Sequence, residues 1–190
     1  MAKARKEGKP KRNRANLVKR LKLIKQNEDI LKRISDQFSS DIIASDVAFG
    51  LLNIEINPEK NSDIIKWLKD DSDLQCSFLT NIAGIHYPND ANREIVVVYQ
   101  LHSWRNNFRI RLKAYLPLNN PAINSIVDIY NGANWMERET YDFFGVQFKN
   151  HPDLRRILNE DSMDYFPMRK EYHLEDATRE DKDDRFFGRF

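Results

Sequence analysis

Two neighbouring segments of the chain have the patterns of paired β-strands, and they restrict its fold more than any other feature. Residues 94–102 are nearly all apolar, which is typical of a strand buried on both faces. In residues 108–116 apolar side chains alternate with basic or polar ones, which is typical of a strand with one buried face. The linker of residues 103–107 has the length of a hairpin connection. The two segments therefore predict an antiparallel hairpin.

Helical and strand patterns lie on both sides of this hairpin. They predict strands over residues 52–56 and 74–79, and helices over residues 17–34, 61–70, 124–130 and 134–144, the last of them ended by Gly145. A sheet packed against helices is an α+β architecture. We therefore predict an α+β fold with a mixed or mostly antiparallel sheet packed against helices, a basic N-terminal arm and an extended C-terminal tail.

Charge and periodicity divide the chain into three regions. Residues 1–35 are predicted to form a basic arm and an amphipathic helix, since residues 1–25 carry a net charge of +10 while the whole chain carries only +2. Residues 36–150 hold the α+β domain. From residue 151 onward neither the helical nor the strand periodicity of apolar residues is present, although aromatic side chains remain. Residues 151–190 are therefore expected to lie extended on a partner.

Several classes of site are excluded by composition. One cysteine, Cys76, cannot form an internal disulfide, a four-cysteine zinc site or a self-contained iron–sulfur cluster. Neither of the glycine-rich phosphate-binding motifs occurs in the sequence. The longest apolar run, residues 95–99, is much shorter than the roughly 20 residues that span a bilayer. We expect no resident cofactor, no metal and no membrane-spanning helix in this chain.

The densest group of charged side chains lies on the last predicted helix and just after it. Its candidate functional residues are Glu137, Arg138, Glu139, Asp142, His151, Asp153, Arg155 and Arg156. Because Arg138 and Asp142 are one helical turn apart and Glu139 is on the same turn, we expect the arginine to be held between these two carboxylates. The pattern indicates a buried or interfacial ion-pair network.

A sharper interpretation of the same group is chemical. Glu137, Glu139 and His151 could serve as general acid and base, or could contribute to a metal site. However, the two glutamates point to different faces of the helix, and no second histidine stands at ligand spacing. The spacing therefore favours a structural or interface role over catalysis.

The same region resembles a known protein family. Residues 133–148 (ANWMERETYDFFGVQF), continued by residues 151–158 (HPDLRRIL), closely resemble the signature of the C subunit of respiratory NADH:quinone oxidoreductase, which is also called the 30-kDa subunit or subunit 9 of complex I. Residues 166–170 (FPMRK) resemble a further segment of that family, with Phe166 where histidine is common and Met168 in place of leucine. The likeness extends over roughly residues 45–175, and the basic arm lies outside it.

The resemblance implies a structural subunit in the peripheral arm of a proton-translocating complex. Such a subunit supports electron transfer to quinone without holding a redox centre, while iron–sulfur clusters, FMN and quinone are expected in partner subunits. In the family it packs beside the homologue of the D subunit, which forms the quinone cavity with the B subunit. The charged group, extended by Arg169 and Lys170, then becomes a partner interface rather than an active site.

The resemblance also implies a location. We expect a peripheral position on the cytoplasmic side of the bacterial inner membrane, with the matrix side of the mitochondrial inner membrane as the alternative. Membrane association would then occur through the complex.

The basic N-terminal arm leaves another hypothesis open, which is a nucleic-acid or ribosome-associated binding protein. The remainder of the chain is acidic and lacks the interleaved aromatic and basic residues of RNA-binding surfaces. We therefore expect no direct contact with nucleic acid.

Overall fold

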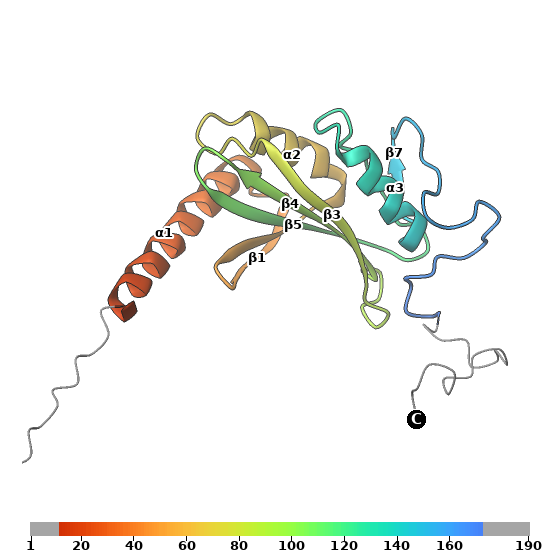
Figure 1. The fold of residues 1–190 in the computed structure, drawn as a ribbon, viewed down its shortest axis with the longest axis horizontal. Helices are drawn as coiled ribbons and strands as arrows, with labels where there is room; N and C mark the ends of the chain where they lie inside the picture. The colour runs from red at the N-terminus through yellow and green to blue at the C-terminus, as the bar shows by residue number, and fades with distance from the viewer. Residues whose placement is uncertain (1–11, 173–190) are drawn as a thin grey trace, which may run out of the picture.

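The computed structural model describes residues 12–172, with side chains from residue 25 onward. The elements are α1 (Arg12–Phe38), β1 (Ile42–Ala48), β2 (Leu51–Ile56), a 3-10 turn η1 (Pro58–Lys60), α2 (Asn61–Asp70), β3 (Phe78–His86), β4 (Ile95–Ser103), β5 (Phe108–Leu116), β6 (Ala122–Asn124), α3 (Ala133–Phe144) and β7 (Gln147–Lys149). A five-stranded sheet in the order β1-β2-β5-β4-β3 is packed against helices (Figure 1). The predicted α+β fold is confirmed.

The hairpin of β4 and β5 is the middle of this sheet. The two strands pair antiparallel over nine positions, from Ile95 opposite Leu116 to Ser103 opposite Phe108. β4 is buried along most of its length, and β5 alternates between buried and more exposed residues, as their sequences predict. The sheet is mixed because β2 joins β5 in parallel, whereas the other neighbouring strands are antiparallel.

The three described α-helices pack on the same face of the sheet. Strand register aligns Gly84, Val97 and Ala114 in one row across β3, β4 and β5, and Phe144 of α3 lies against Gly84. Buried side chains of α1 and α2 join the same apolar core as the inward residues of the strands. These helix residues are Ile30 and Ile34 of α1 and Ile64, Ile65 and Leu68 of α2.

Two predicted elements are wrong in detail. The predicted helix at residues 124–130 is a single turn, because Glu137 accepts the backbone N–H of Ile126 and β6 is paired in parallel with β7. The predicted strand at residues 74–79 begins only at Phe78. The residues before Phe78 are held in turns, because the carboxylate of Asp71 accepts hydrogen bonds from the N–H groups of Asp73 and Leu74.

Several strands are short or irregular enough that periodicity did not predict them. β1 is an edge strand with mostly exposed residues, while β6 and β7 contain three residues each. α1 continues across residue 35, and Ile34 is fully buried, so the end of the predicted first region lies within one helix. Residues 1–11 of the basic arm and residues 173–190 of the predicted tail lie outside the described residues.

Gly84 allows α3 to lie directly on β3. A Cβ atom at this position would be 2.3 Å from Cδ2 of Phe144, which is itself buried. We expect Gly84→Ala to lower the free energy of unfolding by about 1–3 kcal/mol, because the overpacked helix must shift. Denaturant titration measures this change, and truncating the ring with Phe144→Leu should recover part of it.

The matched control is Gly132→Ala, since no atom lies within 4 Å of a Cβ built at Gly132. Its effect should stay within about 0.5 kcal/mol. Equal losses from the two glycine variants would contradict the proposed close approach of α3 to β3.

Candidate functional site

The candidate residues are organised by α3, which carries charged groups on its buried side. Glu137, Arg138 and Asp142 are buried, whereas Glu139 is exposed. The two glutamates therefore lie on different sides of the helix, as predicted. The helix ends at Gly145, whose φ of 78° is left-handed and whose N–H donates to the carbonyl oxygen of Tyr141.

The carboxylate of Asp142 binds the chain segment that follows β7. Its Oδ2 accepts three consecutive backbone N–H groups, from Ile157 at 3.1 Å, Leu158 at 2.8 Å and Asn159 at 2.9 Å. Its Oδ1 accepts the side chain of Asn159 at 3.1 Å and Nη1 of Arg156 at 2.8 Å. Burial by itself would raise the pKa of Asp142, but these donors together hold it below its usual range.

Arg156 extends this network further along the chain. Its Nη2 donates to the carbonyl oxygens of Met163 at 2.7 Å and Tyr165 at 2.9 Å, and its guanidinium lies 5.1 Å from the ring centre of Phe166. One guanidinium thus connects Asp142 on α3 with a segment that has no helix or strand of its own among its described residues. The carbonyl groups of an irregular segment need side-chain donors, because no helical turn or neighbouring strand supplies backbone N–H groups to them.

The predicted ion pair of Arg138 is wrong. Arg138 donates from Nε to the carbonyl oxygen of Arg155 at 3.2 Å and from Nη2 to that of Arg156 at 3.0 Å. The partner of Asp142 is Arg156, and Glu139 is exposed. Helical spacing does not predict this arrangement, because the partners of Arg138 and Asp142 come from an irregular segment outside the helix.

The later basic residues also fix the C-terminal segment to the domain. Nε of Arg169 donates to the carbonyl oxygen of Phe144 at 2.9 Å, at the C-terminal end of α3. The backbone N–H of Lys170 donates to Nδ1 of His86 at 2.8 Å, while the side chain of Lys170 is exposed. A Cβ atom at Gly145 would be 2.5 Å from the ring of Phe166, so the glycine also allows this segment to approach α3.

Glu137 is the second buried anchor. Its carboxylate accepts the hydroxyl of Ser125 at 2.6 Å and the N–H of Ile126 at 2.8 Å. Burial raises the pKa of Glu137 to about 7, although these two donors oppose the shift. Nothing in the local sequence pattern indicates that Glu137 would hold this distant turn.

His151 lies beside Glu137 but has other hydrogen-bond partners. Its Nδ1 accepts the N–H of Asp153 at 3.1 Å, so the ring proton is placed on Nε2, which donates to the carbonyl oxygen of Asn134 at 3.2 Å. Nε2 is 4.0 Å from Oε2 of Glu137, and both side chains are fully buried. The structure therefore brings together two members of the predicted acid–base group and leaves Glu139 on the surface.

The remaining candidates are at the surface. Asp153 and Arg155 form an exposed ion pair with a separation of 2.9 Å. Large apolar side chains are exposed on α3 and on the segment that it holds. They are Trp135, Leu158, Tyr165, Met168 and Tyr172, and we call them the α3 surface. The aromatic character of this region is evident from the sequence, but its lack of periodicity gives no indication of which side chains point inward and which outward.

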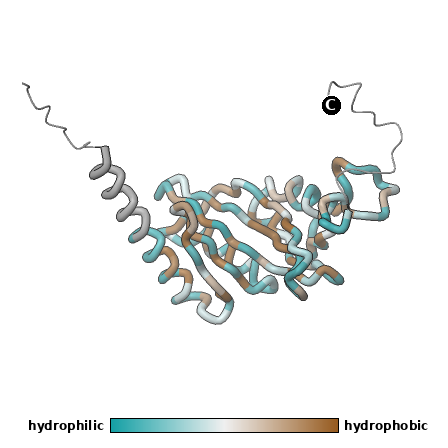
Figure 2. The backbone as a smooth tube through the Cα atoms, turned by 90° about the horizontal axis from the view of Figure 1, so that it is seen from below, coloured by the Kyte–Doolittle hydropathy of each residue, from teal (hydrophilic) through white to brown (hydrophobic). Residues whose placement is uncertain are grey.

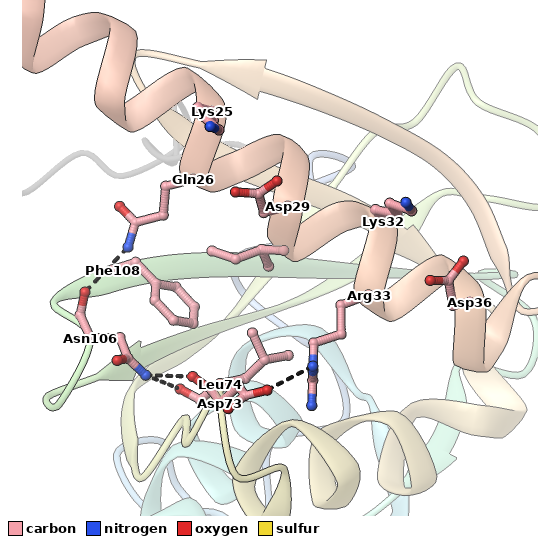
Figure 3. Close-up of a pocket in the computed structure, with 11 residues that line it drawn as sticks. Lys25, Gln26, Asp29, Lys32, Arg33, Asp36, Asp73, Leu74, Asn106 and Phe108 are labelled. Atoms are coloured by element: carbon pink, nitrogen blue, oxygen red, sulfur yellow. Dashed lines mark hydrogen bonds and ion pairs between the residues drawn. The ribbon is translucent and has the colours of Figure 1, made fainter.

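A cavity of about 620 Å³ lies between α1, the turns after α2 and the β4–β5 hairpin, away from these candidates. In Figure 3, Arg33 of α1 reaches Asp73, and Gln26 reaches the backbone of Asn106. Arg33 also binds Asp71 at 2.8 Å. The residues that line the cavity therefore connect α1 to the rest of the domain.

Within the described part of the chain, no group of three or more His, Cys, Asp or Glu side chains is placed to hold a metal ion. None of the described helices is both long and apolar enough to cross a membrane.

Comparison with known proteins identifies the family. Residues 54–178 match the sequence model described as "Respiratory-chain NADH dehydrogenase, 30 Kd subunit". The chain belongs to this family. A similar member is the C subunit of the NADH-quinone oxidoreductase of Geobacter sulfurreducens, which is 37% identical over 155 residues, covering 82% of this chain and 94% of that protein.

Two solved structures have a fold similar to that of this chain. A trypsin-resistant fragment of Nqo5 superposes with a TM-score of 0.57 at 26% identity, over 67% of this chain and 98% of the fragment. A chain in the membrane-bound sulfane sulfur reductase, an archaeal respiratory membrane complex, has the same fold, with a TM-score of 0.66 at 23% identity over 78% of this chain and 86% of that chain.

The family signature contains a coupled pair, Asp142 and Arg156. In a double-mutant cycle of Asp142→Ala and Arg156→Ala, we expect a coupling energy of about 2 kcal/mol, because each single change leaves a buried charge without its partner. Denaturant unfolding of the four proteins measures it. The exposed pair Asp153 and Arg155 is the control and should couple by less than about 1 kcal/mol. Equal coupling in both pairs would contradict the buried clamp, by which we mean Asp142 and Arg156 with the backbone groups that they bind.

Glu137 predicts a specific pH dependence. Because its pKa rises from 4.5 to about 7 on folding, the protonated acid is favoured in the native state, and stability from this group is lost as pH rises through that window. Glu137→Gln resembles the protonated acid and removes this loss. The stability of the variant relative to the wild type should therefore increase between pH 4.5 and 7, by up to about 3 kcal/mol, and be level above that.

Urea denaturation at a series of pH values measures the difference. Glu139→Gln, on the exposed side of the same helix, should leave the dependence of the free energy of unfolding on pH as it is in the wild type. A constant difference between Glu137→Gln and the wild type across the window would show that Glu137 is ionised throughout.

Proposed function

We propose that this chain is a structural subunit in the peripheral arm of a proton-translocating NADH:quinone oxidoreductase. It positions neighbouring subunits, supports electron transfer to quinone, and holds no redox centre of its own. The observation that carries the proposal is the division of the family signature into two sides. Its buried charges bind the chain's own backbone, whereas three of its large apolar side chains, Trp135, Leu158 and Met168, are exposed on the α3 surface.

This division favours assembly over catalysis. The carboxylate of Glu137 and the imidazole of His151 are fully buried and engaged with protein groups, so they are not open to a substrate. Exposed aromatic and aliphatic side chains on a rigid support are typical anchors of protein–protein interfaces. The α3 surface is thus the proposed contact with other subunits of the complex.

Membership of the family suggests the partners. We infer that homologues of the D and B subunits are neighbours of this chain, and that iron–sulfur clusters, FMN and quinone are bound by partner subunits. The chain would be held peripherally on the cytoplasmic side of a bacterial inner membrane through the complex, or on the matrix side in mitochondria. The alternative hypothesis, in which the basic arm binds nucleic acid, concerns residues largely outside the described side chains, and our expectation that it makes no such contact stays a prediction.

Two tryptophans provide a matched test of the proposed interface. Trp135 on the α3 surface is 61% exposed, and Trp104 at the β4–β5 hairpin is 66% exposed. In a strain that lacks its own copy of the gene, we expect Trp135→Ala to weaken incorporation into the complex by about tenfold or more, whereas Trp104→Ala assembles like the wild type. Native gels with immunodetection measure the incorporated fraction.

The same preparations test the absence of a catalytic role. NADH:quinone activity per assembled complex should be equal for both variants and the wild type, because the proposed role ends with assembly. Normal assembly of Trp135→Ala would contradict the interface, and normal assembly with reduced activity would indicate a part in electron transfer. Stoichiometric iron–sulfur absorbance in the purified chain would contradict the claim that it holds no redox centre.

A further inference from the structure

The sheet face opposite the helices is not covered by any described helix. Register places the side chains of Arg109, Arg111 and Lys113 on this face, since their neighbours Ile110 and Leu112 point into the core. In Figure 1, α2 and α3 lie above the sheet, and the view from below in Figure 2 looks onto strands along which hydrophilic and hydrophobic residues alternate. We call this surface the open face.

A row of positive charge follows β5 along the open face. Arg109, Arg111 and Lys113 occupy alternate positions, so their Cα atoms are about 7 Å apart. Within the described residues, none of the three has a carboxylate within 4 Å. Arg111 reaches only the side-chain oxygen of Asn53, at 3.3 Å.

The acidic groups of the same face already have partners. Glu55 binds Nη2 of Arg93 at 2.9 Å, and Asp46 accepts the side-chain amide of Asn53 at 2.9 Å. The guanidinium of Arg93 also lies 4.1 Å from the ring centre of Tyr115. Glu55 lies opposite Lys113 in the register but is bound by Arg93, and Asp46 keeps its charge because Asn53 is neutral. Among the described residues, the row on β5 is therefore only partly balanced by the carboxylates of this face.

Polar atoms on this face also lack partners. Five buried side-chain polar atoms of the described chain make no hydrogen bond, and three of them are here: Oε1 of Glu55, Nε of Arg93 and Nε of Arg111. Buried polar groups without partners are unfavourable and uncommon in native proteins. Because these three atoms are buried, a molecule bound to the face could reach them only after their side chains moved.

An apolar strip runs beside the positive row. Val96 and Val98 of β4 face the same side but are almost fully buried within the chain. The apolar surface open to a partner is therefore that of Ile85 and Ala83 of β3, which register places next to them and which are half-buried. A phosphate-bearing ligand would gain nothing from this strip and would meet Glu55 and Asp46 on the same face. A polypeptide can offer both carboxylates and apolar side chains.

We propose that the open face binds an acidic segment of a partner protein, with its carboxylates over Arg109, Arg111 and Lys113 and its apolar side chains over β3. The side chains of an extended segment that point to one side repeat at about the same 7 Å as the row on β5. This interface is separate from the α3 surface and does not depend on the proposed function.

The test uses the full chain and a labelled short peptide in which glutamate alternates with valine. Fluorescence anisotropy should show binding that is weakened about tenfold by Arg109→Glu with Lys113→Glu. The control changes the same net charge elsewhere, with Lys66→Glu and Lys149→Glu at exposed positions of α2 and β7, and should shift the affinity by less than about twofold. Any contribution of the basic arm is common to both variants.

Two further probes separate the other classes of partner. Vesicles with anionic phospholipid and a single-stranded RNA should bind the two variants equally. The proposal would be overturned if both variants lost peptide binding equally. It would also be overturned if the open-face variant lost vesicle or RNA binding but kept its peptide binding. Arg109→Gln with Lys113→Gln replaces the charge reversal if circular dichroism shows that the reversal unfolds the chain, and it should still weaken peptide binding severalfold.

Discussion

The buried carboxylate of Asp142 is the constraint on which the C-terminal third of the structure depends. It accepts three consecutive backbone N–H groups and the guanidinium of Arg156, while Arg138 binds the carbonyl groups just before them. The segment that follows β7 has no helix or strand up to Tyr172, so these side chains supply the hydrogen bonds that regular structure would otherwise provide. α3 and this segment therefore act as one body.

The outer side of the same body carries large apolar residues among exposed charges such as Glu139, Asp153 and Arg155. Trp135, Leu158 and Met168 are exposed although they lie within the most charged part of the sequence. An irregular segment binds a partner through such side chains more tightly when its backbone is already ordered, since ordering on binding costs free energy. The clamp around Asp142 would thus serve assembly by preorganising the α3 surface.

How far sequence predicts this structure depends on the range of the interactions. The β4–β5 hairpin and α3 were predicted because their burial repeats with a local period and Gly145 ends the helix. The helix expected at residues 124–130 and the ion pair expected between Arg138 and Asp142 were wrong for one reason. In both cases a buried side chain binds backbone that is distant in sequence, as Glu137 does with Ile126 and Asp142 with Leu158, and no periodicity reports such contacts.

The central claim is that the clamp presents the α3 surface to other subunits of a respiratory complex. Hydrogen–deuterium exchange of the free chain and of the same chain in the purified, assembled complex tests it most directly. The account predicts slower exchange in the complex over residues 160–172, whose backbone makes few hydrogen bonds in the chain itself. Unchanged exchange in these residues, with protection gained only elsewhere in the chain, would contradict it.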